Sequence, residues 1–179
     1  MGALKTIPKT TMSQLTLPIT EVLVVATCWQ TEPDAEAVIQ RAIAAAAEAV
    51  DADLGEAELA VMLTDDSGIR TLNNNWRGFD KPTNVLSFPA LQPVGARGPD
   101  DAPPMLGDIA IAYETMRREA DEEAKPFEHH LSHLAVHGFL HLVGYDHENN
   151  DDAEAMEALE REVLAQLGIP DPYAGSGNG

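Results

Sequence analysis

The chain is poor in several residue types, and each shortage removes a class of protein. Only Cys28 among its 179 residues is a cysteine, so no disulfide can form within the chain and a metal site has to rely on other ligands. No apolar run approaches the roughly 18–20 residues that cross a bilayer. The first residues also lack the apolar stretch of a signal peptide. We therefore expect a cytoplasmic protein with no membrane contact.

The chain is also short of positive charge. It has 11 Lys and Arg against 30 Asp and Glu, a formal net charge of −19. Such a protein repels polyanions at long range, but its net charge does not exclude a local basic groove. Four of the basic residues fall in one segment: Arg70, Arg77, Lys81 and Arg97. Acids crowd the last predicted helix, which we interpret as a solvated face: Asp151, Asp152, Glu154, Glu157, Glu160 and Glu162.

The histidines are the residues of this chain that could form a metal site. Three of its six histidines form the motif His137-x₃-His141-x₂-Gly144-x₂-His147. Residues four apart share one face of a helix, so His137 and His141 can point at one ion, and a left-handed Gly144 can turn the chain so that His147 joins them. Three imidazoles leave the fourth position of a tetrahedral Zn²⁺ open, as in a catalytic zinc site.

We predict one Zn²⁺ per chain at these three residues, although Ni²⁺ or Cu²⁺ would also bind such a site. His133 lies one turn earlier on the same helix face, and we expect it behind the ligands or at the surface. Zinc lowers the pKa of its water and polarises carbonyl or phosphoryl oxygens, so hydrolysis is the leading reaction class. The spacing equals that of metzincin peptidases, but Gly138 stands where those enzymes carry a glutamate base, which argues against their mechanism.

The order of apolar patterns predicts an α+β fold: a single domain with a roughly four-stranded mixed sheet, about five helices and a central, zincin-like metal-binding helix. Residues 1–17 form a flexible leader, 18–168 the domain and 169–179 a disordered tail. A long Pro- and Gly-rich loop spans residues 90–105. Strands are predicted at 21–27, 58–64, 84–88 and 107–113. Thr31, Asp65 or Asp66, and Asp151 or Asp152 are the expected helix caps.

Three segments together resemble one family. The histidine motif, the run from Leu72 to Pro89 and the block Leu106-Gly107-Asp108-Ile109 are similar to those of YbeY endoribonucleases, the rRNA maturation factors. The resemblance covers roughly residues 57–167. In one departure, Asn84 stands where many members carry aspartate.

The resemblance implies a zinc-dependent, single-strand-specific endoribonuclease. It would hydrolyse RNA phosphodiester bonds in 3′-end maturation of the small-subunit (16S) rRNA and in ribosome quality control. Its partners would be the rRNA precursor and the small subunit or its assembly proteins. Two alternatives stay open: a metallopeptidase-like hydrolase with its base elsewhere, and a non-catalytic assembly factor with a structural metal, which the acidic surface favours.

The resemblance also assigns roles. His137, His141 and His147 match the metal ligands, with His137 essential for catalysis, and Arg77 matches the family's basic active-site residue. An arginine there can grip a phosphate, or can simply be favoured by the helix dipole. Three weaker candidates are Ser87 and Asp108, which line a cleft or hydrogen-bond structure, and Asp146, which orients an imidazole or caps the turn. The general base is unassigned, and either metal-activated water or the ribose 2′-hydroxyl attacks.

Overall fold

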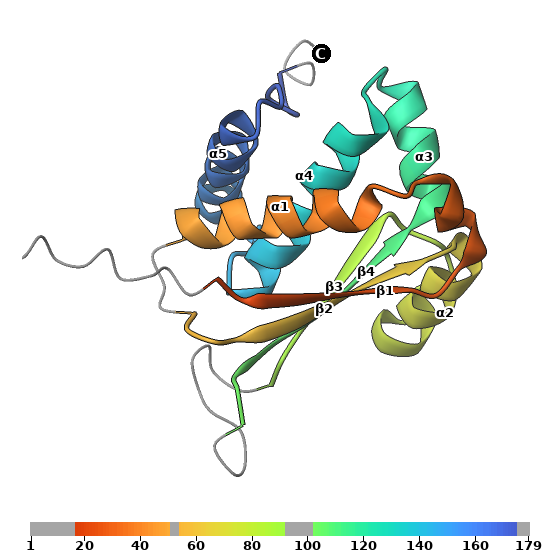
Figure 1. Cartoon of the computed structure of the whole chain (residues 1–179), viewed down its shortest axis with the longest axis horizontal. Coiled ribbons are helices and arrows are strands. Elements are labelled where there is room, and N and C mark those ends of the chain that lie inside the picture. Colours follow the sequence, from red (N-terminus) through yellow and green to blue (C-terminus); the bar gives the residue numbers. More distant parts are fainter. Residues whose placement is uncertain (1–16, 51–53, 92–101, 175–179) are drawn as a thin grey trace, which may run out of the picture.

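The computed structural model describes residues 17–50, 54–91 and 102–174. Helices α1, α4 and α5 lie on one side of a sheet and α2 lies on the other (Figure 1). The predicted α+β class, with its four-stranded mixed sheet and five α-helices, is confirmed, while the likeness to zincins stays a prediction. The elements are β1 (Ile19–Val24), a 3-10 helix η1 (Thr27–Thr31), α1 (Ala35–Ala49), β2 (Glu58–Thr64), α2 (Asp66–Arg77), β3 (Val85–Pro89), β4 (Met105–Ala112), α3 (Tyr113–Glu122), α4 (Phe127–Leu142) and α5 (Asn150–Gln166).

The sheet has the strand order β1-β2-β4-β3. The first three strands in this order run parallel, and β3 pairs antiparallel with β4 at the edge. Helix α1 makes the crossover that parallel β1 and β2 require. Helix α4, which carries the histidines, packs against both β3 and β4, so the edge strand β3 lies beside the candidate site.

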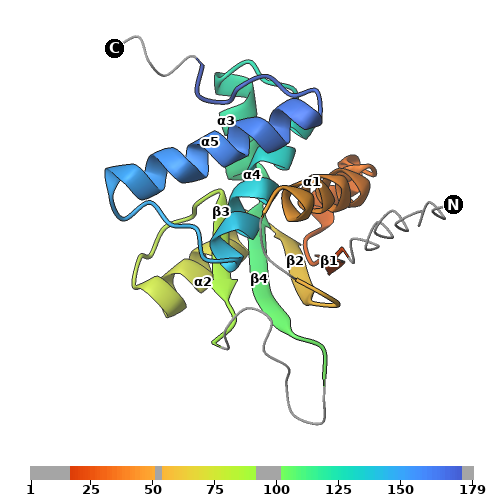
Figure 2. The same cartoon turned by 90° about the vertical axis from the view of Figure 1, so that its left-hand side faces the viewer.

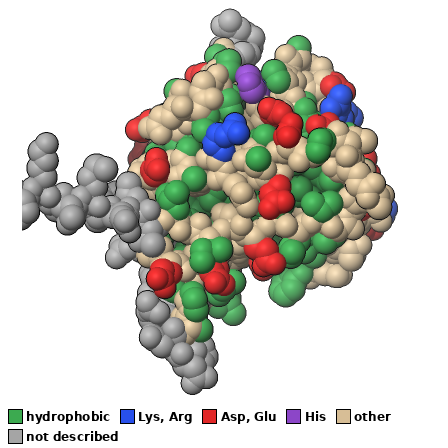
Figure 3. All heavy atoms as spheres, viewed as in Figure 1, with side chains coloured by type: hydrophobic (Ala, Val, Ile, Leu, Met, Phe, Trp, Pro, Cys, Tyr) green, Lys and Arg blue, Asp and Glu red, His purple; other side chains and the backbone are tan. Residues whose placement is uncertain are grey.

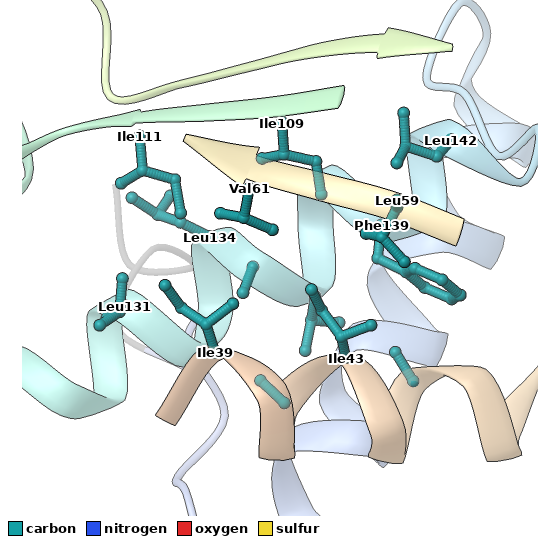
Figure 4. Close-up of a cluster of buried hydrophobic side chains, with 14 of the residues drawn as sticks. Ile39, Ile43, Leu59, Val61, Ile109, Ile111, Leu131, Leu134, Phe139 and Leu142 are labelled. Atoms are coloured by element: carbon teal, nitrogen blue, oxygen red, sulfur yellow. The ribbon is translucent and has the colours of Figure 1, made fainter. Parts of the chain in front are cut away.

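The core fills the space between the sheet and α4. Alternate strand residues point to one face, so Val61 and Ile109 meet Leu134 and Phe139 of α4 (Figure 4). Helix α4 also contacts α1, α3 and α5, which makes it the central helix, as predicted. His137 and His141 are thus carried by this central helix.

Helix α2 covers the opposite face of the sheet (Figure 2). The Asp65 side chain accepts from the backbone N–H of Gly68 at 2.7 Å, so of the two predicted caps Asp65 is the one used. The helix ends as predicted at Gly78, whose left-handed φ of 76° suits glycine. Arg77 is therefore fixed in the last turn of α2.

Two other predicted caps were wrong. Thr31 lies in η1, where its hydroxyl donates to the Cys28 carbonyl instead of capping α1. Helix α5 is capped by Asn149, whose side-chain oxygen accepts from the Asp152 N–H at 2.9 Å. Residues 151 and 152 stand inside the first turn, where their negative charge meets the positive helix end.

The strand predicted to be buried at 21–27 is an edge strand instead. Leu23, Val24 and Val25 are exposed, because β1 has a neighbouring strand on one side only. An apolar run of this length reads the same in a central strand as at an edge. The prediction therefore found the strand but misjudged its position in the sheet.

The structure describes the predicted chain ends only in part. Residues 1–16 of the predicted leader and 92–101 of the predicted loop lie outside the described residues. We expected disorder from residue 169, whereas the described chain continues to Ala174. There Lys125 donates to the Pro172 carbonyl and the Tyr173 hydroxyl donates to Glu160, which ties this segment to the α3–α4 connection and to α5.

Acidic side chains are spread over the face seen in Figure 3, with few basic ones among them. This agrees with the net charge of −19. Among the helices of the described ranges, none is long and apolar enough to cross a membrane.

Candidate metal centre

The three motif histidines converge at the C-terminal end of α4. His137 and His141 come from the last turns of the helix, and His147 returns from the turn that Gly144, with a φ of 104°, allows. One nitrogen from each ring lies within 4.8 Å of the others. The Nε2 atoms of His137 and His141 are 3.1 Å apart, close to the roughly 3.3 Å expected for two nitrogens on one tetrahedral Zn²⁺. The donor set therefore fits a metal ion.

Two of the rings are also held in the form that binds metals. His137 Nδ1 lies 2.6 Å from Glu160 Oε1, and His141 Nδ1 lies 3.0 Å from the Tyr145 carbonyl. Both partners are acceptors, so each Nδ1 carries the proton and each Nε2 presents its lone pair. Burial, followed by the charges of His137 and His147, lowers the pKa of His141 and favours its neutral form. The fold thus directs two neutral donors at one point.

Glu160 lies where the sequence does not predict it. The acids of the last helix are predicted to form a solvated face, but the Glu160 side chain is 0% exposed. Burial raises the pKa of this carboxyl, yet hydrogen bonds from His133, His137 and Tyr173 outweigh burial and lower the pKa to about 2. A buried carboxylate therefore stands directly behind His137, a predicted metal ligand. The signal was its spacing, because residue 160 falls on the same helix face as buried Met156 and Val163.

His133 belongs to this buried group and not to the ligand set. Its Nε2 lies 3.5 Å from Glu160 Oε2, and its ring stands edge-on to His137 with 6.4 Å between centroids. Tyr173, from the segment after α5, also donates to Glu160. The position behind the ligands is one of the two that we considered for His133.

We expect Glu160→Gln to weaken Zn²⁺ binding about 10–100-fold, the usual cost of losing a ligand's hydrogen-bonding carboxylate. The amide lacks the negative charge that holds the proton on His137 Nδ1. Competition with a chromophoric chelator measures the Kd for Zn²⁺. Glu154→Gln is the matched control, since Glu154 is exposed on the same helix. Equal affinities for the two variants would remove Glu160 from the site.

Gly138 has no side chain that could transfer a proton, and the structure leaves no room for a larger residue at this position. A Cβ at this position would lie 3.0 Å from Ile109 Cγ2 and 3.2 Å from Ser87 Oγ. Helix α4 therefore approaches the sheet here without room for a larger side chain. Ser87 completes this contact, because its hydroxyl donates to the Gly138 carbonyl at 3.1 Å.

An open cavity of about 640 Å³ lies in front of the histidines. Arg77, the last residue of α2, lines it together with residues of the edge strand β3. The cavity is lined by Arg77, Val85, Leu86, Ser87, Pro89, Ala90, Met105, Leu106, His137, His141, Leu142, Gly144, Tyr145, Asp146 and His147. Arg77 and Ser87, two of the predicted site residues, therefore share a cavity with the three histidines.

The remaining candidates are placed differently. Asp146 lines the cavity, and its carboxylate accepts from the His147 backbone N–H at 2.7 Å, which is the turn-capping role. Asp108 does not line the cavity. In β4 it alternates with Ile109, which packs toward α4, so Asp108 belongs to the α2 face of the sheet. Only Asp146 of these two is close to the histidines.

Asn84 has a structural role that an aspartate could not take over unchanged. Its amide nitrogen donates to Glu119 at 3.0 Å while its oxygen accepts from the Val85 N–H at 2.7 Å. Aspartate would lose the donor and set two carboxylates side by side. Asn84, rather than an aspartate, therefore suits the neighbouring Glu119 of α3.

Known proteins resemble the chain over most of its length. A model of the family described as Endoribonuclease YbeY matches residues 26–168. A curated Endoribonuclease YbeY from Bradyrhizobium diazoefficiens is 80% identical, covering 92% of this chain and 90% of its own. One from Rhodopseudomonas palustris is 74% identical, covering 91% and 96%.

A solved solution structure from Thermotoga maritima is also similar. It has a TM-score of 0.52 and 25% sequence identity, and the match covers 90% of this chain and 99% of that one. The overall fold described above is therefore similar to that of a structure determined independently. The family match and the curated relatives together show that the chain belongs to the endoribonuclease YbeY family.

Proposed function

We propose that the protein is a Zn²⁺-dependent endoribonuclease that cuts single-stranded RNA. One observation carries this proposal: two metal-directed Nε2 atoms open onto a cavity that also contains Arg77. A closed structural site would have used a fourth protein ligand and left no room for a substrate. Membership of the endoribonuclease YbeY family supports the choice of RNA.

The finer assignment concerns the substrate in the cell. We propose that it is the small-subunit rRNA precursor, cut in 3′-end maturation and ribosome quality control, with the small subunit or its assembly proteins as partners. This rests on the family resemblance. Because ribosomes are assembled in the cytoplasm, the substrate also assigns the reaction to that compartment.

The chain's own residues divide the work. When bound, Zn²⁺ supplies a polarised water and a Lewis acid for a phosphoryl oxygen. His137, His141 and His147 would hold the ion, and Glu160 keeps the proton of His137 on Nδ1. Arg77 binds the phosphate and stabilises the charge that develops on its oxygens. Asp146 keeps the turn that presents His147.

Cleavage of a labelled single-stranded rRNA fragment tests the proposal. We expect cleavage with Zn²⁺, its loss after chelation, its return on adding Zn²⁺, and no comparable cleavage of a duplex. A 2′-deoxy substitution at the scissile nucleotide separates the two attacks, because unchanged cleavage excludes the ribose hydroxyl. RNA cleavage that survives complete metal removal would overturn the proposal.

A further inference from the structure

We propose that Trp76 and Phe79, with Arg77 and Lys81, form a stacking platform that holds the bases of a single-stranded RNA next to the metal cavity. The proposal deepens the ribonuclease function and rests on it. These residues lie at the end of α2 and in the turn that follows. They will be called the α2 platform.

The first observation is exposure. Trp76 is 72% exposed and Phe79 is 50% exposed. No other Phe, Trp or Tyr in the described part of the chain is exposed, and the second tryptophan, Trp29, is only 2% exposed. Apolar rings are costly to leave in water. Both exposed rings nevertheless stand at one helix end.

The second observation is charge. The Arg77 guanidinium lies 5.5 Å and the Lys81 ammonium 5.7 Å from the centre of the Phe79 ring. Neither cation has an acidic partner among the described residues, whereas Arg70, Arg117, Lys125 and Arg161 do. In a chain with a net charge of −19, two unpaired cations beside two exposed rings are a local exception. Phosphates and bases together match that chemistry.

The third observation is that the platform is held in place. The buried Asn73 amide donates to the Lys81 carbonyl at 2.9 Å, and Arg70 bonds Asp80 at 2.8 Å. The Trp76 ring meets Phe88 of β3 edge-on, with 6.1 Å between centroids. The turn is therefore fixed before any ligand arrives, which lowers the entropy lost on binding.

The platform is continuous with the site. Arg77 lines the metal cavity and at the same time covers Phe79. Phe88, which contacts Trp76, packs against the buried cluster that contains Leu86, and Leu86 also lines the cavity. A strand whose phosphate meets Arg77 would place its neighbouring bases on Phe79 and Trp76. Duplex bases are already stacked on each other, so this surface selects single strands.

Tryptophan fluorescence of the zinc-loaded full chain tests the proposal. The probe is a 2′-O-methyl oligoadenylate of about ten nucleotides, within the usual site size for single strands. We expect it to quench the emission of exposed Trp76 while buried Trp29, bonded to the Thr64 carbonyl, is unaffected. Trp76→Phe should abolish the quenching.

Affinity gives a second measurement. By fluorescence anisotropy of the labelled oligonucleotide, Trp76→Ala and Phe79→Ala should each weaken binding about tenfold, the effect of losing one stacked base. Val25→Ala removes an exposed apolar side chain just after β1 and should change nothing. The Zn²⁺ content of each variant shows that its metal site is intact.

The outcomes separate the two proposals. If the wild type cleaves RNA but all variants bind as it does, the α2 platform is wrong and the ribonuclease function stands. If the wild type neither binds nor cleaves RNA, both are wrong. Quenching by peptides but not by the oligonucleotide would also overturn the platform and assign the surface to a protein partner.

Discussion

Replacing His141 with alanine should lower RNA cleavage about a thousandfold or more and remove the bound metal. The substitution deletes one of the two Nε2 atoms that lie 3.1 Å apart, together with the bond to the Tyr145 carbonyl. Two histidines, one of them exposed, remain to hold the ion. Loss of several kcal/mol of charge stabilisation in the transition state corresponds to a rate change of this size.

Metal content by atomic emission and cleavage of the same rRNA fragment are the two measurements. His129→Ala is the matched control, because it removes a histidine from the first turn of the same helix and outside the ligand group. It should keep both metal and activity. Full activity in His141→Ala without metal would instead favour a contaminating nuclease or a metal-free reaction.

The clustering of the three histidines was predictable because its geometry is local. Helical spacing and one glycine place His137, His141 and His147 together without any knowledge of the rest of the fold. The residue that hydrogen-bonds His137 from behind could not be predicted from local spacing. Glu160 reaches His137 from another helix, 23 residues further along the chain, and sits among acids that do face solvent.

The difference between local and long-range structure also explains where other residues were placed differently from expectation. The sequence showed that 21–27 was apolar but not that β1 would stand at the edge of the sheet, since strand order depends on long-range pairing. Asp108 was expected either to line the cleft or to hydrogen-bond structure, and the alternation of β4 places it on the face away from the cavity. Ser87 takes both of the positions considered for it, because it lines the cavity and its hydroxyl donates to the Gly138 carbonyl.

The position of Arg77 depends both on its own helix and on the packing of that helix beside the cavity. In the sequence it was either a phosphate-binding residue or a cation favoured by the helix C-terminus. The structure gives it both positions, since it ends α2 and lines the metal cavity. Only an experiment that separates stability from turnover distinguishes the two roles.

We expect Arg77→Ala to lower kcat for RNA cleavage about a hundredfold, with the Zn²⁺ content and Tm close to those of the wild type. One lost donor to a developing charge costs about this much. Arg77→Lys keeps the charge but cannot form the planar, paired contact to a phosphate, so its activity should lie between the two. Arg118→Ala, an exposed arginine of α3 without an ion pair among the described residues, is the control. If Arg77→Ala cleaves as well as Arg118→Ala and only melts earlier, the helix dipole explains this residue, and the phosphate must be held by another group in the cavity.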